Sequence, residues 1–232
     1  METKLNYKRT FLIGLAFLSI CSFWQMYDNI IPLILQNTYH LGETMTGAVM
    51  ALDNVLAIFL LPVFGALSDK VHTKLGRRMP FIVAGTILAV IFMMLLPMID
   101  NAEKARWGTG ESFSNQVIFL AVLFFTLVSM GLYRSPAVAL MPDVTPNHLR
   151  SRANAVINLM GAVGGVYALI MIKVLVGKGE TPDYLPLFAS IAAVMAIAVG
   201  ILVITIRENK LREEVEKAEA ANAGTIEEKA MA

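Results

Sequence analysis

Four ionisable side chains lie inside long apolar stretches of the sequence: Asp28, Asp53, Arg134 and Lys173, the last near the outer end of its stretch, where it is expected to extend to the membrane surface. Ionisable residues in such segments are energetically expensive and usually functional. Two carboxylates in one low-dielectric site do not both ionise cheaply, so Asp28 and Asp53 together are suited to exchanging a proton. Carboxylate and carbonyl oxygens also suit a hard cation, which leaves Na⁺ open as an alternative to H⁺. For Asp53, pairing with a group outside this chain is the competing interpretation.

Polar and aromatic residues surround Asp28 in the sequence. Trp24, Tyr27 and Asp28 share one helical face because they are spaced three to four residues apart. Carboxylates accept hydroxyl protons and a guanidinium offers several donors, so such a set can bind a polar molecule. The predicted binding residues are Trp24, Gln25, Tyr27, Asp28, Asn29, Arg134 and Asn158, and further candidates for the wall are Tyr133, Asn154 and Tyr167. For each Asn or Tyr taken alone, a hydrogen bond between helices is the simpler interpretation.

The elements that must position these groups are six long apolar runs. The chain has 232 residues, of which 56% are hydrophobic and 16% are charged, whereas a soluble domain carries about a quarter charged residues. About 20 apolar residues cross a bilayer as a helix, and within lipid every backbone polar group must be satisfied internally. The sequence therefore predicts an all-α integral membrane protein, a six-helix bundle with spans at residues 11–36, 45–68, 80–99, 117–141, 153–176 and 184–206.

Lysines and arginines are distributed unevenly between the two sides of this bundle. With the amino terminus inside, the inner segments hold fourteen of them and the outer loops hold three. Because cationic loops stay on the cytoplasmic side, we expect a multi-pass protein of the plasma (inner) membrane with both termini in the cytoplasm. Residues 1–206 form the predicted bundle and residues 207–232 a charged cytoplasmic tail. Two charge pairs in this tail are spaced for a helix: Glu208/Arg212 and Glu213/Lys217.

In these spans the carboxylates of Asp28 and Asp53 are predicted at one depth in the membrane, and the guanidinium of Arg134 is predicted at another. At a rise of about 1.5 Å per residue, Asp28 and Asp53 lie roughly 5–7 Å from the midplane toward the outside, and Arg134 lies roughly 7 Å toward the inside. The gap between Asp28 and Arg134 along the membrane normal is therefore on the order of 14 Å, which predicts no direct ion pair between them.

The composition also excludes several classes of function. A net charge of +1 argues against a nucleic-acid partner. The single cysteine, Cys21, excludes disulfides and cysteine-based metal clusters. The sequence shows no phosphate-binding glycine loop of the Walker type, no nucleophile elbow and no metal-ligand spacing. We therefore expect no enzymatic activity, no metal site and no cofactor apart from a coupling ion.

The loop after the second span carries the strongest motif, with Gly65, Asp69, Arg77, Arg78 and Pro80. A carboxylate that faces two guanidinium groups here can form an ionic latch between helix ends. The alternative, which the chemistry leaves open, is that these cations only set the topology. The segment resembles the loop between the second and third spans of the major facilitator superfamily, whose general form is Gly-x-x-x-Asp-Arg-x-Gly-Arg-Arg. Here the spacing from the Asp to the Gly is four residues longer.

A second stretch supports this resemblance. Residues 134–165, with Asp143 in the loop and Arg150 and Arg152 at the start of the next run, are similar to the same region of the sucrose–proton symporters. Those carriers belong to the glycoside–pentoside–hexuronide cation symporter branch, which the longer Gly-Arg-Arg-x-Pro-Phe-Ile motif also resembles. We expect Asp143, Arg150 and Arg152 to contribute to the cytoplasmic latch.

The resemblance implies a carrier built from two six-helix halves, each an inverted pair of three-helix repeats, with the site at their interface. This chain resembles the amino-terminal half, so its expected partners are membrane lipid, a small sugar, and a carboxy-terminal half in the same chain or a second one. The implied function is sugar or glycoside symport with a cation by alternating access. The gap between Asp28 and Arg134 has about the length of a disaccharide. The alternatives are a drug–proton antiporter of the same superfamily and a non-transporting membrane subunit or sensor on the same scaffold.

Overall fold

The computed structural model of the chain describes residues 5–106, 112–177, 179 and 182–231. Within these residues, six helices are long and apolar enough to cross a membrane, which confirms the predicted all-α class and its six spans. A seventh helix follows them. The helices are α1 (Tyr7–Asn37), α2 (Glu43–Lys70), α3 (Met79–Ala105), α4 (Ser112–Asp143), α5 (Arg150–Leu175), α6 (Leu185–Thr205) and α7 (Glu208–Met231), with the short 3-10 turn η1 (Asn147–Leu149) before α5.

Most helices extend beyond the apolar runs that predict them. The largest difference is at the end of α3, where the run ends at Ile99 but the helix continues to Ala105. The added turns hold polar residues that still complete helical hydrogen bonds. Lys104 pairs there with Asp100 one turn earlier, at 2.6 Å. Hydrophobicity therefore locates each span, and polar pairing sets the end of this helix.

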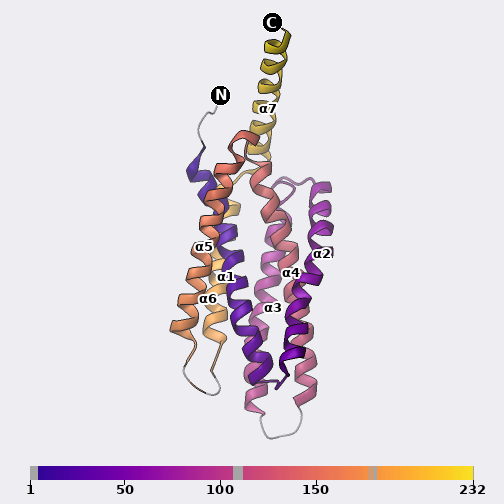
Figure 1. Cartoon of the computed structure of the whole chain (residues 1–232), viewed down its shortest axis with the longest axis vertical. Helices are drawn as coiled ribbons and strands as arrows, with labels where there is room; N and C mark the ends of the chain where they lie inside the picture. Colours follow the sequence, from indigo (N-terminus) through magenta and orange to yellow (C-terminus); the bar gives the residue numbers. More distant parts are fainter. Residues whose placement is uncertain (1–4, 107–111, 178, 180–181, 232) are drawn as a thin grey trace.

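The six helices form two related groups of three. Helix α1 packs against α5 and α6, helix α4 packs against α2 and α3, and α3 meets α6 between the groups (Figure 1). The two groups are related when α1, α2 and α3 are matched with α4, α5 and α6 in that order. The α2/α4 contact then corresponds to the α5/α1 contact, and the α3/α4 contact corresponds to the α6/α1 contact. Helices α1 and α4 start at opposite ends of the bundle, as an inverted repeat requires. Helix α7 projects beyond the bundle at the end that carries both chain termini.

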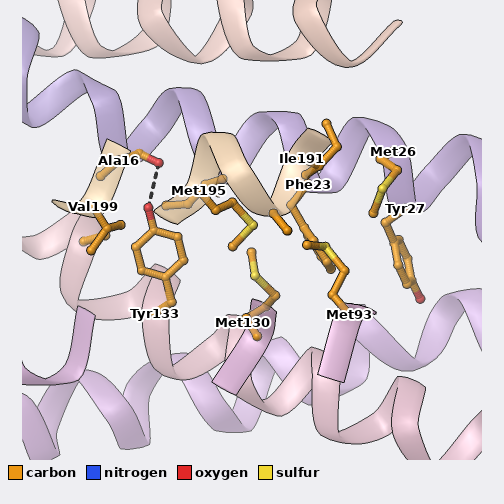
Figure 2. Close-up of a cluster of buried hydrophobic side chains, with 14 of the residues drawn as sticks. Ala16, Phe23, Met26, Tyr27, Met93, Met130, Tyr133, Ile191, Met195 and Val199 are labelled. Atoms are coloured by element: carbon orange, nitrogen blue, oxygen red, sulfur yellow. Dashed lines mark hydrogen bonds between the residues drawn. The ribbon is translucent and has the colours of Figure 1, made fainter. Parts of the chain in front are cut away.

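The core lies where α1, α3, α4 and α6 meet, and it is rich in methionine (Figure 2). Methionine is unbranched and polarisable, so it fills irregular gaps between helices. The labelled side chains in this core, all buried, are Ala16, Phe23, Met26, Tyr27, Met93, Met130, Tyr133, Ile191, Met195 and Val199.

Tyr133, a candidate for the wall of the binding site, belongs to this core instead. Its side chain is fully buried, and its hydroxyl donates to the carbonyl oxygen of Ala16 at 3.0 Å. The same hydroxyl forms a hydrogen bond of 2.6 Å with Ser19 Oγ. Tyr133 therefore ties α4 to α1, which is the simpler of the two interpretations that its sequence position leaves open.

Helices α1 and α5 approach each other closely because α5 has glycine at the contact. The Ser22 hydroxyl donates to the carbonyl oxygen of Gly164 at 2.9 Å. A Cβ atom at Gly164 would overlap the carbonyl oxygen of Leu18. Small residues allow such close approach between spanning helices. The contact fixes the spacing of the two helices that frame the site described next.

Candidate functional site

A pocket of about 420 Å³ lies between α1 and α5. Small-molecule sites have volumes of about 300–1,000 Å³, so this pocket is large enough for a small ligand. Four of the predicted binding residues line it: Trp24, Gln25 and Asp28 from α1, and Asn158 from α5. The pocket thus combines an indole ring, a carboxylate and two amides, among apolar side chains and the glycines of α5.

Arg134 reaches the same region from α4 without lining the pocket. Its guanidinium carbon lies 5.5 Å from the centre of the Trp24 ring, within the range of a cation–π contact. The indole also meets the rings of Phe23 and Tyr27 edge-on, with centroids 5.3 Å and 5.4 Å away. Trp24 therefore lines the pocket and contacts the guanidinium, and its ring packs against two other rings.

The indole N–H of Trp24 is buried and has no hydrogen-bond partner among the described residues. Leaving a buried donor without an acceptor costs about 1–3 kcal/mol. The exposed carboxylate of Asp28 supplies acceptor oxygens at the pocket, whereas the indole N–H of Trp24 is enclosed.

The two predicted coupling carboxylates stand on α1 and α2, which contact each other. Asp28 of α1 is exposed and lines the pocket. Asp53 is half-buried and accepts a hydrogen bond of 2.9 Å from Asn54 Nδ2. In the described part of the chain, neither carboxylate forms an ion pair with Arg134. Two carboxylates thus lie on α1 and α2, and the guanidinium of Arg134 lies on α4.

Tyr27 and Asn29 occupy other positions on α1. Tyr27 is buried in the core, where its ring stacks on Phe23 at 6.1 Å. Asn29 is exposed, and its amide donates to the carbonyl oxygen of Gln25 at 2.7 Å. Neither lines the pocket, because the stripe of α1 that faces α5 runs through Trp24 and Asp28. The adjacent stripe, which holds Tyr27, faces α4 and α6.

A second group of predicted residues meets at the end of the bundle that carries both termini. Arg78 pairs with Asp69 at 2.6 Å and with Asp143 at 2.9 Å. Arg77 pairs with the same two carboxylates, at 3.5 Å and 2.9 Å. Arg78 also donates to the carbonyl oxygen of Gly65 at 3.2 Å. This ionic cluster of Asp69, Arg77, Arg78 and Asp143 joins the end of α2, the start of α3 and the end of α4.

Two arginines expected to join Asp143 in the latch form no ion pair with it among the described residues. Arg150 donates to the backbone oxygens of Pro142 at 2.8 Å and Thr145 at 3.2 Å. It thereby satisfies carbonyl groups that the end of α4 leaves without helical partners. Arg152 is exposed and forms no ion pair within the described residues. The ionic cluster is therefore narrower than the predicted latch, because the backbone at the end of α4 attracts Arg150.

Glu208, the first residue of α7, is a member of this region that the sequence did not reveal. Its side chain is 1% exposed, and its carboxylate accepts hydrogen bonds from the backbone N–H groups of Arg77, Arg78 and Met79 at 3.0–3.1 Å. The N-terminus of a helix carries unpaired N–H groups and a partial positive charge, so a carboxylate is stabilising there. Glu208 thus caps α3 from about 130 residues further along the chain.

The loop before α3 is shaped to admit this carboxylate. Gly76 has a φ of +124°, a conformation that side-chain-bearing residues rarely adopt. A Cβ atom there would also overlap the side chain of Glu208. The backbone conformation and the nearby Glu208 side chain therefore both explain why this position of the Gly-Arg-Arg motif is a glycine.

The charge pairs predicted in the tail are half correct. Glu213 and Lys217 pair at 2.6 Å, as predicted. The predicted pair of Glu208 with Arg212 is wrong, because Glu208 turns to α3 and Arg212 pairs with Glu216 at 2.8 Å. The Lys217 ammonium, which donates to Glu213, holds the pKa of that carboxyl below its usual value.

Comparisons with known proteins relate the chain to sugar carriers. It is 35% identical over 116 residues to sucrose transport protein SUC4 of Arabidopsis thaliana, a match that covers 47% of this chain and 22% of the relative. It is 26% identical over 137 residues to sucrose transport protein SUT3 of Oryza sativa subsp. japonica, which covers 56% and 27% respectively. For sucrose transport protein SUC3 of Arabidopsis thaliana the identity is 27% over 120 residues, covering 48% and 20%. The matched part of the chain thus spans about a quarter of these relatives or less.

A family match covers nearly the whole chain. The sequence model of the Major Facilitator Superfamily matches residues 6–231. The matched range includes all six spanning helices, the pocket between α1 and α5, and the ionic cluster with Glu208. The six helices fit one half of that superfamily's fold, and the chain belongs to the Major Facilitator Superfamily.

Proposed function

We propose that the chain is the amino-terminal half of a sugar–cation symporter that works by alternating access and binds its substrate in the pocket between α1 and α5. The observation that carries this proposal is the pocket itself, where Trp24, Asp28 and Asn158 face one space within the spans. Sugar hydroxyls donate to carboxylates and amides, and the apolar face of a sugar ring packs on an indole. The names of the relatives, sucrose transport proteins, support a sugar as the substrate.

Arg134 contributes to this site through its contact with Trp24. Its guanidinium lies over the Trp24 ring, so it fixes the ring and places a positive charge near the pocket. A planar guanidinium offers several donors to sugar oxygens once a side-chain rotation exposes them. In this proposal the sugar lies between Asp28 and the guanidinium of Arg134.

Coupling to a cation uses the pair of carboxylates. Asp28 and Asp53 lie on contacting helices, and binding a proton or Na⁺ at the pair would remove the repulsion between two carboxylates in a low-dielectric site. The cation and the sugar would then favour the same state of the carrier, which is the thermodynamic requirement for symport. Asp28 is the carboxylate that also contacts the sugar.

A second six-helix bundle completes the site. Among the described residues of α2, only Thr46 and Ser68 are buried, while Asp53 and Asn54 lie on its open side. Asn158 is exposed on α5 in the same way. Polar groups that face acyl chains are costly, so these faces meet polar partners across a water-containing cleft. The second bundle is supplied by the same chain or by another.

The ionic cluster acts as a gate on the cytoplasmic side. The uneven distribution of lysine and arginine favours a plasma-membrane orientation with both termini in the cytoplasm. In that orientation Arg77 and Arg78 hold the inner ends of α2, α3 and α4 together. Separating these helix ends, as inward opening requires, breaks the pairs with Asp69 and Asp143.

The test is proton-driven or sodium-driven uptake of radiolabelled sucrose into vesicles that contain the chain together with the bundle that completes it. We expect Asp28→Asn to abolish accumulation against a gradient, because an amide cannot exchange the coupling proton or neutralise Na⁺. The matched control is Glu43→Gln, an exposed carboxylate at the start of α2 outside the pocket, which should stay within about twofold of the unmodified protein. Accumulation by Asp28→Asn at the unmodified rate would remove Asp28 from coupling.

A further inference from the structure

A second pocket, of about 300 Å³, lies where the start of α1 meets the junction between α6 and α7. Four of its lining residues are cations: Lys8 and Arg9 from α1, and Arg207 and Lys210 from the junction. Its apolar lining residues are Leu12, Ile206 and Leu211. Neither the pocket between α1 and α5 nor the ionic cluster includes any of these residues.

The pocket carries excess positive charge. Arg9 pairs with Glu214 at 3.3 Å, which neutralises one of the four cations. Lys8, Arg207 and Lys210 are exposed and form no ion pair within the described part of the chain. Three uncompensated cations around one cavity attract an anion, and the ammonium and guanidinium groups supply only hydrogen-bond donors.

The position of the pocket identifies the kind of anion. Ile206 directly follows the 21 apolar residues of α6, and Leu12 lies in the first turns of the α1 span. The pocket therefore lies at the level where the spans leave the hydrocarbon and meet the headgroups. Ile204 of α6 and Phe11 of α1, which adjoin it in the sequence, are 83% and 43% exposed, so apolar surface continues from the pocket toward the membrane.

We propose that this pocket binds an anionic phospholipid, with its phosphate among Lys8, Arg207 and Lys210 and its acyl chains along the exposed apolar surface of α1 and α6. Basic pockets at the ends of spanning helices suit such headgroups, and each cation near an anionic membrane surface contributes about 1 kcal/mol. A free phosphate ion would satisfy the cations but would make no use of the exposed apolar surface at Phe11 and Ile204 beside the pocket.

The bound lipid would also hold the tail in place. Lys210 belongs to α7 and Lys8 to α1, so one headgroup bridges the two helices beside the Arg9–Glu214 pair. The lipid would thereby steady the junction from which Glu208 reaches the start of α3.

The test is native mass spectrometry of the full chain in a mild detergent, titrated with phosphatidylglycerol or with phosphatidylcholine of the same acyl chains. We expect phosphatidylglycerol to bind at least tenfold more tightly. The double variant Lys8→Gln/Lys210→Gln should lose about 30-fold in affinity, which corresponds to about 1 kcal/mol per lysine. The variant Lys8→Arg/Lys210→Arg, which keeps both charges, should bind as the unmodified chain does.

The matched control is Lys70→Gln/Lys74→Gln, two exposed lysines at the same end of the bundle but outside the pocket. It should stay within twofold of the unmodified chain. Equal losses in both glutamine variants would show attraction by overall charge and would overturn the proposal. Displacement of the lipid by millimolar inorganic phosphate would overturn it too, because the site would then be a phosphate site. Lipid affinity is measured without any sugar uptake, so a failure of this proposal can be distinguished from a failure of the proposed transport function.

Discussion

Trp24 lines the pocket and also contacts a guanidinium and two aromatic rings. Its side chain lines the pocket, and the centre of its ring lies 5.5 Å from the guanidinium carbon of Arg134. Its indole N–H is buried and has no hydrogen-bond partner among the described residues. Trp24 therefore connects the two groups, Asp28 and Arg134, that the sequence places at different depths.

The contribution of the Glu208 carboxylate to the stability of the protein can be tested by a single substitution. Glu208→Gln keeps the shape of the side chain but removes the negative charge from the start of α3. We expect the free energy of unfolding to fall by about 1–2 kcal/mol, because a carboxylate at a helix N-terminus is stabilising when it is partly buried. The measurement is the thermal unfolding midpoint in detergent.

The control for this change is Glu213→Gln, which breaks an exposed pair on the same helix. Exposed pairs contribute little, so its effect should remain within about 0.5 kcal/mol. Equal shifts of the unfolding midpoint in the two variants would contradict the role of Glu208 as the cap of α3.

At the scale of elements, the α1–α5 contact decides the geometry of the pocket. The carbonyl oxygen of Gly164 accepts the hydroxyl proton of Ser22, and the missing side chain lets the two backbones approach. A similar contact in the other group of three joins α4 and α2, where Ser135 Oγ donates to the carbonyl oxygen of Leu61 at 2.7 Å. A serine-to-backbone hydrogen bond thus ties α1 to α5 and α4 to α2.

The prediction at this scale compares two glycines inside helices. Gly164→Ala should destabilise the bundle by about 1–3 kcal/mol or more, because the new Cβ overlaps Leu18. Gly200→Ala in α6 meets nothing within 4 Å, so it should be neutral or stabilising by up to about 1 kcal/mol. Unfolding midpoints in detergent check both values. A neutral Gly164→Ala would mean that α1 and α5 are further apart than described.

The sequence predicts the spans well because hydrophobic length is a local property. It also predicts the α1 stripe with Trp24 and Asp28, since the helical period is local too. It does not predict which stripe meets which helix, so Tyr27 and Tyr133 fall in the core instead of the pocket. The role of Glu208 cannot be predicted from the sequence for the same reason, because its hydrogen-bond partners lie about 130 residues away.

At the scale of the whole molecule, the described residues form a bundle with one well-buried core and two open helices, α2 and α5. Four helices, α1, α3, α4 and α6, share the methionine-rich core, while α2 has only two buried residues within its described length. The open helices carry Asp53 and Asn158, and the pocket adjoins one of them. The proposed function therefore depends on the pocket being filled with water and not with acyl chains.

Cys21 allows this to be measured directly, because it lines the pocket and is the single cysteine of the chain. The measurement is the rate at which a water-soluble, membrane-impermeant maleimide labels Cys21 in membranes, with and without sucrose. The proposed function predicts that Cys21 is labelled and that sucrose slows the labelling, whereas the same concentration of glycerol does not. Labelling by lipid-soluble maleimides alone, or a rate that sucrose leaves unchanged, would contradict it.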